Sequence, residues 1–508
     1  MEEAGRKEHG KQYMSLKVSA VLEIGSSGIR LLIANLDTRT GFFEILENAV
    51  MPTGLGSDVF LHGTISILTI NECVETLMEF QELLTAYGIN SRHCHVIASS
   101  ALRESVNRDT FIEIVLMRTG FHIRVLEDLE ENHYMYLAVQ HALKDEQKSL
   151  AEKNSIIIET GGGSTEVLLL RQGQIETVHS FQLGTIRVAA LVQSIENTPD
   201  TLKRIIGDQI LSIAARLNAE LPLESVDNVV IMGSEARLLA GRTASTFHDT
   251  YWSTRVDDFM SSAKNLAELP ESTLIQKYEI ETSEAVFLRY GLLILASFLE
   301  TTGAKQVFIP MYSVREGFLM SLVVNEKNLI HKELKKHILA SVRNLGRKFS
   351  IDELHAAWVR KNTLKLFDEL VAIHHLSARD RLLAEIAALL HDIGVFIRSG
   401  SHHKHSEYII NNSELFSISN DERTMIACVA RYHRKGGPVA SHSNYMYLDK
   451  ADRIRVLKIS ALLRIADALD HNHNQSIKIV SCEKNHSNLV IVTDNPAELG
   501  LIRQDIEN

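Results

Sequence analysis

Residues 157–169 read Ile-Ile-Glu-Thr-Gly-Gly-Gly-Ser-Thr-Glu-Val-Leu-Leu, and residues 21–33 read Val-Leu-Glu-Ile-Gly-Ser-Ser-Gly-Ile-Arg-Leu-Leu-Ile. In each stretch an apolar strand carries an acid near its end, Glu159 or Glu23, and a four-residue run of only glycine and serine leads into a second apolar strand. One such run alone is usually an ordinary hairpin turn. Two copies with matched acids instead predict two similar halves of the molecule that face each other across a cleft.

The glycine and serine loops have the composition of an anion-binding site. Because such a loop has no bulky side chains, several of its backbone N–H groups can converge on an anion. The carboxylate before each loop can hold a cation, directly or through water, beside a bound phosphate. The repeat continues into a turn and a third strand, at 37–46 after the first loop and at 171–178 after the second. The pattern therefore predicts a phosphate-binding cleft with one loop from each half.

The length and composition are those of a large globular protein. With 508 residues the chain is too long for one hydrophobic core, and we expect two to four domains. An apolar content of 45% with 23% charged residues is ordinary, and no apolar run approaches the ~20 residues that span a bilayer. The start of the chain, residues 1–14, is polar and mixed in charge, without the apolar core of a signal peptide.

The cysteines and the net charge indicate where the protein functions and which partners to expect. The four cysteines form no CxxC pair and are typical of reduced thiols, so we expect a cytoplasmic protein. The net charge of −11 gives no general attraction to polyanions. We therefore expect neither DNA nor a membrane among the partners, and a polyphosphate or nucleotide substrate requires local basic groups.

Two successive segments, 15–145 and 146–323, alternate strand and helix patterns, which indicates an α/β architecture. The patterns of the first segment are strands at 18–24, 29–36, 42–47 and 93–98 and helices at 71–87 and 130–143. The second segment restarts with three strands and continues with helices at 201–219 and 283–300 and strands at 229–232 and 306–309. We expect two subdomains of similar fold.

Beyond residue 323 the strand patterns give way to helical periodicity over 324–475, and a short β-containing tail follows over 476–508. The helical patterns cover 331–348, 351–373, 378–393, 404–413, 421–433 and 454–469. The tail has strand patterns at 477–481 and 489–492. The first of these helices is rich in lysine and arginine, which is typical of a solvated helix face.

Histidines are concentrated in the helical segment, where 11 of the 23 lie between His355 and His473. Imidazole and carboxylate groups from several helices can converge on a divalent metal inside a bundle. This segment resembles the HD (His-Asp) domain of metal-dependent phosphohydrolases. The resemblance implies a second divalent metal such as Mn²⁺, with ligands His355, His391, Asp392, His405, His433 and Asp467. Ordinary surface or core histidines are the alternative, above all for His374, His375, His442, His471 and His473.

Short motifs along nearly the whole chain resemble the exopolyphosphatase / guanosine pentaphosphate phosphohydrolase (Ppx/GppA) family. The two loops stand where that family has its phosphate loops. The other matching motifs are Ala98-Ser-Ser-Ala-Leu-Arg103-Glu104, Glu130-Glu131-Asn-His-Tyr-Met-Tyr-Leu, Leu183-Gly184-Thr185-Ile-Arg187 and Val314-Arg315-Glu316-Gly317. The resemblance implies two actin-like (ribonuclease H-like) ATPase-superfamily subdomains, followed by the all-α HD-type domain and the β tail. It also implies a homodimer.

The chemistry implied by this resemblance is hydrolysis of a terminal phosphoanhydride of inorganic polyphosphate or guanosine pentaphosphate. The resemblance assigns Glu131 as the general base that activates water. It places Mg²⁺ near Glu159 and Glu166, with Glu23 as a third acid, where the ion would neutralise phosphoryl charge. The phosphate-binding residues would be Gly25, Ser26, Ser27, Arg103, Gly161, Gly162, Gly163 and Ser164.

The residue types and their positions alone leave the roles of three side chains open. Glu131 also has the position of a helix N-terminal acid that the helix dipole stabilises. Arg187 and Arg315 are suited either to holding phosphate or to forming salt bridges between the subdomains.

The chain departs from the family pattern at both loops. The family normally has aspartate at Glu23 and Glu159, and Asn-Ser where this chain has Ser27-Gly28. Glutamate keeps the charge but adds a methylene, and Mg²⁺ demands near-ideal octahedral geometry. Two other functions therefore stay open: an HD phosphohydrolase acting on a nucleotide with the front domains as sensor, and a non-catalytic polyphosphate- or alarmone-binding regulator. Family members often continue beyond the point that corresponds to Asn508, so we expect a final element to be absent.

Overall fold

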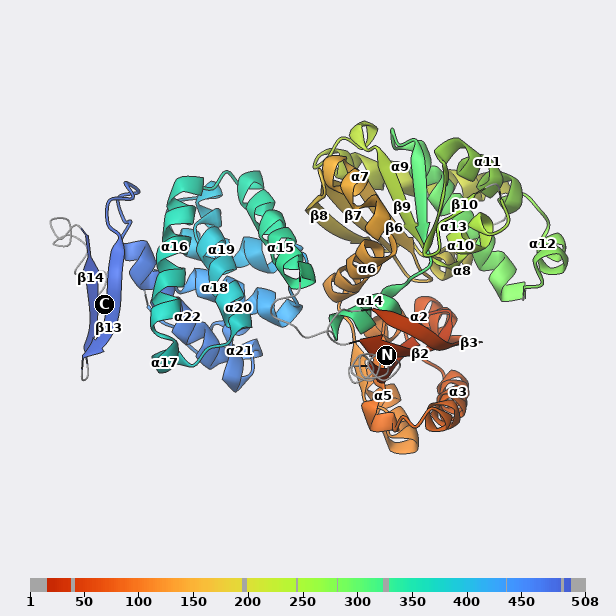
Figure 1. Ribbon diagram of the computed structural model, residues 1–508, viewed down its shortest axis with the longest axis horizontal. Coiled ribbons are helices and arrows are strands. Elements are labelled where there is room, and N and C mark those ends of the chain that lie inside the picture. The colour runs from red at the N-terminus through yellow and green to blue at the C-terminus, as the bar shows by residue number, and fades with distance from the viewer. Residues whose placement is uncertain are drawn as a thin grey trace, which may run out of the picture. The chain divides into compact units, whose positions relative to one another are not determined.

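The computed structural model divides the chain into two compact units, Met1–Leu334 and Lys335–Asn508 (Figure 1). It describes residues 16–37, 42–193, 199–243, 245–280, 282–322, 329–434, 436–485 and 488–494. The first unit is α/β and the second is mainly helical. Among the described residues, no helix combines the length and apolar character needed to cross a bilayer.

The first sheet of the α/β unit has five strands in the order β3-β2-β1-β4-β5. These are β1 (Leu16–Ile24), β2 (Gly28–Asp37), β3 (Phe43–Pro52), β4 (His95–Ala98) and β5 (Ile123–Val125). Strands β1 to β3 are antiparallel, whereas β4 and β5 continue the sheet in parallel on the other side of β1. The helices of this half are α2 (Leu55–His62), α3 (Ile67–Ala86), α4 (Ser100–Glu104), α5 (Arg108–Thr119) and α6 (Asp128–Ala142).

The second sheet has seven strands in the order β10-β11-β12-β9-β6-β7-β8. They are β6 (Ser155–Thr160), β7 (Thr165–Arg171), β8 (Gln174–Phe181), β9 (Asn228–Met232), β10 (Thr246–Phe247), β11 (Tyr251–Arg255) and β12 (Gln306–Pro310). Strands β6 to β8 are antiparallel, and β9 and β12 extend the sheet in parallel beyond β6. Five of these strands, in the order β8-β7-β6-β9-β12, repeat the order β3-β2-β1-β4-β5 of the first sheet, and β11 and β10 extend the second sheet, so the two halves are similar as predicted.

The glycine and serine loops connect equivalent strands with the same geometry. In the first loop the last strand pair is Ile24 with Ile29, and the Gly25 N–H donates to the Gly28 carbonyl at 3.0 Å. In the second loop the last pair is Thr160 with Thr165, and the Gly161 N–H donates to the Ser164 carbonyl at 2.9 Å. The sequence repeat is therefore a repeat of backbone structure.

Seven helices of the second half surround its sheet and carry the chain back to the first half. They are α7 (Gln147–Glu152), α8 (Thr185–Gln193), α9 (Pro199–Asn218), α10 (Ser234–Ala240), α11 (Val256–Ala267), α12 (Glu271–Tyr278) and α13 (Thr282–Glu300). The next helix, α14 (Val314–Ser321), packs against α6 of the first half. The two helices cross so closely at Gly317 that a Cβ atom there would lie 1.8 Å from the Tyr134 carbonyl oxygen. Glycine is therefore required at this crossing.

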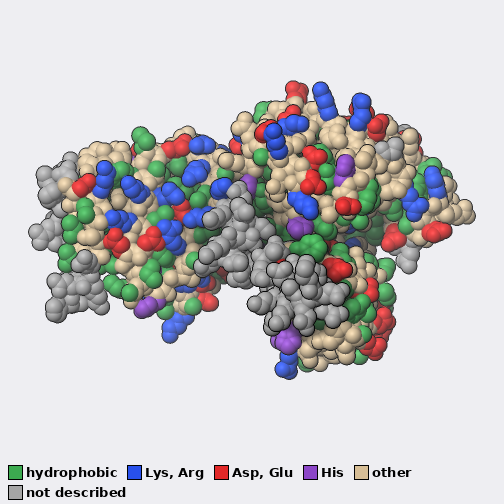
Figure 2. Space-filling view, in the orientation of Figure 1, with side chains coloured by type: hydrophobic (Ala, Val, Ile, Leu, Met, Phe, Trp, Pro, Cys, Tyr) green, Lys and Arg blue, Asp and Glu red, His purple; other side chains and the backbone are tan. Residues whose placement is uncertain are grey.

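The second unit is a helical bundle with a β-hairpin. After α15 (Leu329–Lys348), which crosses the boundary between the units, the bundle is formed by α16 (Glu353–Glu369), α18 (Ala378–Leu390), α20 (Asn420–Arg431) and α22 (Lys450–Ala468). Shorter elements are α17 (Val371–His374), the 3₁₀ helix η5 (Ile393–Phe396), α19 (His402–Asn411), α21 (Ser443–Tyr447) and the strands β13 (Ile479–Asn485) and β14 (Asn488–Thr493). Figure 2 shows basic and acidic side chains interspersed over the visible face of this unit.

Candidate active site and candidate metal centre

A cavity of about 470 Å³ in the α/β unit lies where the two loops meet. Its volume is within the range of small-molecule sites. Its lining includes six of the predicted phosphate-binding residues, Gly25, Ser26, Ser27, Gly161, Gly162 and Ser164. The two loops touch, because a Cβ atom at Gly162 would lie 2.4 Å from the Ser26 Oγ atom. The sequence repeat has thus brought both loops to one cavity.

Backbone hydrogen bonds fix which way the loop peptides point. The Gly56 N–H of α2 donates to the Ser26 carbonyl at 2.8 Å, and the N–H groups of Thr185 and Ile186 at the start of α8 donate to the Gly161 and Gly162 carbonyls at 3.0 and 2.9 Å. In a trans peptide the N–H of the next residue points the opposite way. The N–H groups that follow these three carbonyls therefore point away from α2 and α8.

Carboxylates outnumber arginines in the lining of the cavity. The six acids are Glu23, Glu131, Glu159, Glu166, Glu235 and Glu284, and the three arginines are Arg30, Arg237 and Arg315. Burial, and then the like charges of Glu23 and Glu131, raise the pKa of Glu159 to about 8. An excess of acids opposes a polyanion unless cations accompany it, and carboxylate oxygens are ligands that Mg²⁺ prefers. The donor set therefore fits Mg²⁺.

Two of the cavity arginines carry buried donor groups suited to phosphate oxygens. Among the described residues, Arg237 Nη1 and Arg315 Nε are buried and have no hydrogen-bond partner. Arg315 Nη1 donates to Asn48 Oδ1 at 3.0 Å, and Arg315 Nε itself forms an ion pair with a Glu23 carboxylate oxygen 3.6 Å away. A buried donor without a partner is costly, so an anion at this position would be stabilised.

Glu131 lines the cavity from the first turn of α6, which begins with a capping box between Glu127 and Glu130. Its carboxylate is 3.0 Å from Arg103 Nη1, which also donates to the Leu126 carbonyl at 2.5 Å. Arg103 was expected to hold phosphate oxygens but is not among the residues that line the cavity. Its contacts instead orient the Glu131 carboxylate.

Two further predicted residues contact protein groups at the edge of the cavity. The Glu166 carboxylate, expected beside Mg²⁺, accepts hydrogen bonds from Asn132 Nδ2 at 3.0 Å and Ser180 Oγ at 2.7 Å. It thereby ties the start of α6 to the second sheet. Gly163 lies against Phe60 and Ser100 rather than among the lining residues.

Arg187 connects the two halves. It pairs with Glu104, donates to the Gly163 carbonyl at 2.5 Å, and stacks on the Phe60 ring at 4.2 Å. Of the two roles left open by the sequence, the structure shows the salt bridge.

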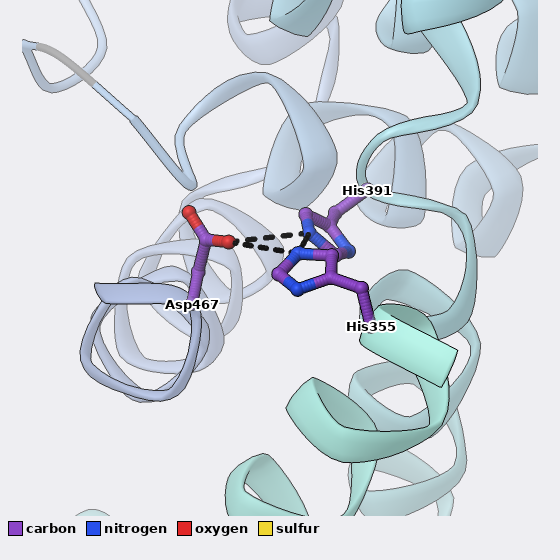
Figure 3. A group of neighbouring side chains, drawn as sticks. All are labelled: His355, His391 and Asp467. Carbon is purple, nitrogen blue, oxygen red and sulfur yellow. Dashed lines mark hydrogen bonds and ion pairs between the residues drawn. The ribbon is translucent and has the colours of Figure 1, made fainter. Parts of the chain in front are cut away.

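In the helical unit, donor atoms of five histidines (His355, His391, His402, His433 and His473) and two aspartates (Asp392 and Asp467) lie close together in three overlapping groups. Figure 3 shows one of these groups, His355, His391 and Asp467. His355 and His391 have their Nε2 atoms 3.2 Å apart, and each Nε2 lies 3.3 Å from Asp467 Oδ1. A second group joins His402 and His433, whose Nε2 atoms are also 3.2 Å apart, to Asp392 Oδ1 at 3.1 and 3.5 Å. These donors, imidazole nitrogen and carboxylate oxygen, suit divalent transition metals.

The other ring nitrogen of each histidine faces an oxygen. For His355 the partner of Nδ1 is Asp470 Oδ2 at 2.8 Å, and for His391, His402 and His433 it is a backbone carbonyl at 2.5 to 2.9 Å. In a neutral ring such partners place the proton on Nδ1, so Nε2 is the nitrogen that a metal would bind in place of a proton.

Charge interactions in this group are strong. Burial disfavours a charged His391, but the negative charges of Asp392 and Asp467 outweigh it and raise the pKa of His391 to about 9. Burial lowers the pKa of His433 to about 4. Although burial opposes it, the neighbouring histidines hold the pKa values of Asp392 and Asp467 below their usual range. Both aspartates are therefore ionised over the physiological pH range.

Comparison with known proteins identifies the family of both units. Residues 34–326 match the Ppx/GppA phosphatase family, and residues 339–506 match Ppx/GppA phosphatase, domain III. The chain belongs to the Ppx/GppA phosphatase family. A guanosine-5'-triphosphate,3'-diphosphate pyrophosphatase of Pseudoalteromonas translucida is 24% identical over 433 residues, covering 82% of this chain and 80% of the relative. The protein of the same name from Photobacterium profundum is 23% identical over 471 residues, covering 90% and 88%.

Solved structures share the fold of the α/β unit. An exopolyphosphatase from Cytophaga hutchinsonii has a TM-score of 0.54 at 18% identity, covering 60% of this chain and 98% of that one. The Ppx/GppA family member of Aquifex aeolicus has a TM-score of 0.50 at 22% identity, covering 62% and 99%. The expected actin-like α/β fold with a helical C-terminal part is confirmed at this level.

One histidine predicted from sequence lies outside the group in this Ppx/GppA protein. The structure brings His402, not His405, to Asp392. Helix α19 begins at His402, two residues earlier than expected, and Gly394 of η5 packs against its first turn. A Cβ atom at Gly394 would lie 2.2 Å from the His402 carbonyl oxygen, so glycine is required where η5 meets the first turn of α19.

Three residues of these sites were missed from the sequence, and the repeat offered a signal for one of them, Arg30. Arg30 pairs across β1 and β2 with Glu23, as Glu166 pairs with Glu159 across β6 and β7, so the two occupy equivalent positions. Arg237 follows strand β9 and the Gly233-Ser234 turn. The partner of His355, Asp470, lay three residues after the predicted ligand Asp467 and gave no separate signal.

Proposed function

We propose that this chain hydrolyses the terminal phosphoanhydride of guanosine pentaphosphate or inorganic polyphosphate in the cavity between the two loops. The observation that carries the proposal is the meeting of both loops, three arginines and the Glu131 carboxylate in one cavity. The relatives that span most of the chain are named guanosine-5'-triphosphate,3'-diphosphate pyrophosphatases, and a structure of similar fold is an exopolyphosphatase. Both names describe release of phosphate from a phosphoanhydride.

Each group has a distinct role in the proposed reaction. The loop amides, with Arg237 and Arg315, hold oxygens of the terminal phosphates. Glu131, oriented by Arg103, accepts a proton from the attacking water, whose oxygen bonds to the terminal phosphorus as the bridging P–O bond breaks. Mg²⁺ held at Glu23 and Glu159 would neutralise charge on the phosphoryl oxygens. Glu166 positions α6 through Asn132 rather than acting as a ligand.

The test is phosphate release from pppGpp and from polyphosphate with Mg²⁺, in the wild type, Glu131→Gln and Glu130→Gln. Loss of the base lowers kcat by about 10²–10⁴. Glu130 is the matched control, because its carboxylate pairs with Arg124 and caps α6 instead of lining the cavity. Full activity in Glu131→Gln would contradict the proposal. Loss of activity in Asp392→Asn alone would move the reaction to the helical unit.

A second candidate function concerns the helical unit, which we propose is an HD-type metal-binding domain. The support is the convergence of His355, His391, Asp392, His433 and Asp467, five of the six residues predicted from sequence. We further propose that the protein is cytoplasmic, binds neither DNA nor membranes, and forms a homodimer. Sedimentation of the full chain at several concentrations tests the dimer, since a constant monomer mass would contradict it.

A further inference from the structure

Helix α4 has only five residues, Ser100–Glu104, and contacts both the second loop and the proposed general base. At its start, Ser100 lines the cavity and lies against the second loop, because a Cβ atom at Gly163 would be 2.7 Å from Ser100 Oγ. At its end, two consecutive residues of opposite charge, Arg103 and Glu104, each form an ion pair with a group outside the helix. The helix therefore contacts both of the parts that the proposed reaction must align.

Arg103 connects α4 to the start of α6. Its Nη1 atom lies 3.0 Å from a Glu131 carboxylate oxygen and donates to the Leu126 carbonyl at 2.5 Å. The Leu126 N–H in turn donates to the carbonyl of Ala98, just before α4, at 2.8 Å. The side chains of Arg103 and Glu131 are only 14% and 13% exposed, so solvent and salt screen this pair weakly. Helix α4 therefore holds in place the carboxylate that is proposed to activate water.

Glu104 connects the same helix to the second half of the α/β unit. Its carboxylate pairs with Arg187, the third residue of α8. Arg187 Nε donates to the Gly163 carbonyl of the second loop at 2.5 Å, and the guanidinium stacks on the Phe60 ring at 4.2 Å. Gly163 packs against the same ring, because a Cβ atom there would lie 2.4 Å from Phe60 Cζ. Arg187 therefore joins Glu104 to the second loop.

These contacts form one continuous series from the second loop to the general base. The three charged side chains that connect the two ends are Arg187, Glu104 and Arg103, and none of the three is among the described residues that line the cavity. Hydrolysis requires the attacking water in line with the terminal phosphorus. The water is held by a carboxylate of the first half, and the phosphate is held in part by a loop of the second half. Contacts between the halves therefore decide the distance between the reacting groups.

We propose that Glu104 is a positioning residue, which through Arg187 and α4 sets the separation between the second loop and the Glu131 carboxylate. The inference rests on the function proposed for this cavity. Because Glu104 acts through other residues and does not line the cavity, its removal changes turnover and leaves substrate binding nearly unchanged. An ion pair that only joined the halves would contribute to stability and leave turnover unchanged.

Steady-state phosphate release by the full-length protein tests this role, with whichever of pppGpp and polyphosphate the wild type hydrolyses faster. A displacement of about 1 Å at a reacting group can cost ~10²-fold, so Glu104→Gln, which acts at a distance, is expected to lower kcat about tenfold with KM within about twofold. Glu176→Gln is the matched control, because Glu176 forms a partly exposed pair with Arg171 inside the second half, and it should keep the wild-type kcat. A wild-type kcat in Glu104→Gln would overturn the proposal. The Glu104 side chain is 34% exposed, so this variant is expected to fold, which circular dichroism checks.

A double variant tests whether Glu104 acts through Glu131. The kcat of Glu104→Gln/Glu131→Gln is expected to equal that of Glu131→Gln, because without the base there is no carboxylate left to position. A further tenfold loss in the double variant would refute the route through Glu131. Full activity in Glu131→Gln would contradict the proposed function itself, whereas a large loss in Glu131→Gln with full activity in Glu104→Gln would contradict the positioning role alone.

Discussion

The two candidate sites of this chain both collect acids, but they differ in how the acids are partnered. In the α/β cavity, six carboxylates face three arginines, and the described residues that line it include no histidine. In the helical unit, two aspartates meet four imidazole nitrogens whose tautomers are fixed by their other partners. Oxygen-only sites suit Mg²⁺, and imidazole-rich sites suit transition metals. The two candidate sites therefore differ in the kind of cation that their donor atoms suit.

The sites also differ in how the fold produces them. The α/β cavity arises from repetition, since one strand–loop–strand unit occurs in each half and the two loops come into contact. The helical cluster arises from convergence, since its candidate ligands come from α16, α19, α22 and the ends of α18 and α20. The α/β cavity therefore depends on how the two halves pack, and the helical cluster depends on how each helix packs. Mutations at the loop contact and in the helices should affect the two sites separately.

The largest expected effect is on the contact between the loops. A Cβ atom in Gly162→Ala would lie 2.4 Å from Ser26 Oγ and 2.7 Å from Ile186 Cδ1, so these two side chains must move and the contact between the loops changes. A displacement of about 1 Å at a reacting group can cost ~10²-fold, so kcat/KM for phosphate release should fall by about that factor. Gly207→Ala is the control, since nothing lies within 4 Å of its Cβ, and should retain full activity. An active Gly162→Ala enzyme would show that contact between the loops is dispensable.

The next largest effect is expected on metal binding in the helical unit. Asp470 accepts from His355 Nδ1 and is itself fully buried. Asp470→Asn should weaken Co²⁺ binding by about 10–100-fold, because groups that orient a metal-binding histidine typically contribute that much. Phosphate release from pppGpp should stay within about twofold. Asp421→Asn, an exposed acid at the start of α20, should leave Co²⁺ affinity unchanged. Equal affinities in the two variants would mean that Asp470 does not orient His355.

The residues of these two sites differed in how well sequence predicted them. The loop residues could be predicted because a sequence repeat is visible without knowledge of packing. The choice between His402 and His405 could not, because both lie in the first turns of α19 and the packing of that helix, which the sequence does not give, decides which one faces Asp392. Among the elements of the fold that were missed, β10 has only two residues and α5 buries only Phe111, Val115 and Thr119. Local patterns are weak where tertiary contacts select the outcome.

The raised pKa of Glu159 in the α/β cavity should have a smaller effect, which appears in the stability of the protein. Because the pKa of Glu159 is raised to about 8, the metal-free folded state binds a proton more tightly than the unfolded chain. Stability therefore falls as pH rises from the usual range of glutamate toward 8. In EDTA at pH 8.5, Glu159→Gln should be more stable than the wild type by about 1–3 kcal/mol, or a few degrees in Tm. The gap should narrow at pH 6, and a gap that widens there would contradict the assignment.

Addition of Mg²⁺ provides the control for this prediction. The ion should raise the Tm of the wild type at pH 8.5 and close part of the gap, because it binds the ionised carboxylate and not the amide. It should stabilise Glu159→Gln less. Equal stabilisation of both proteins would place the Mg²⁺ site away from Glu159.

The smallest effect concerns the ion pair that links the two halves. Arg187 and Glu104 are partly exposed, and pairs of this kind contribute up to about 1 kcal/mol. Glu104→Gln should therefore lower stability by less than that amount and leave KM for pppGpp within about twofold. Arg187→Gln also loses the bond to the Gly163 carbonyl and the stacking on Phe60, so it should destabilise more. If Arg187→Gln instead raises KM tenfold at unchanged stability, then Arg187 holds substrate phosphate, and the link between the halves is provided by the loop contact at Gly162.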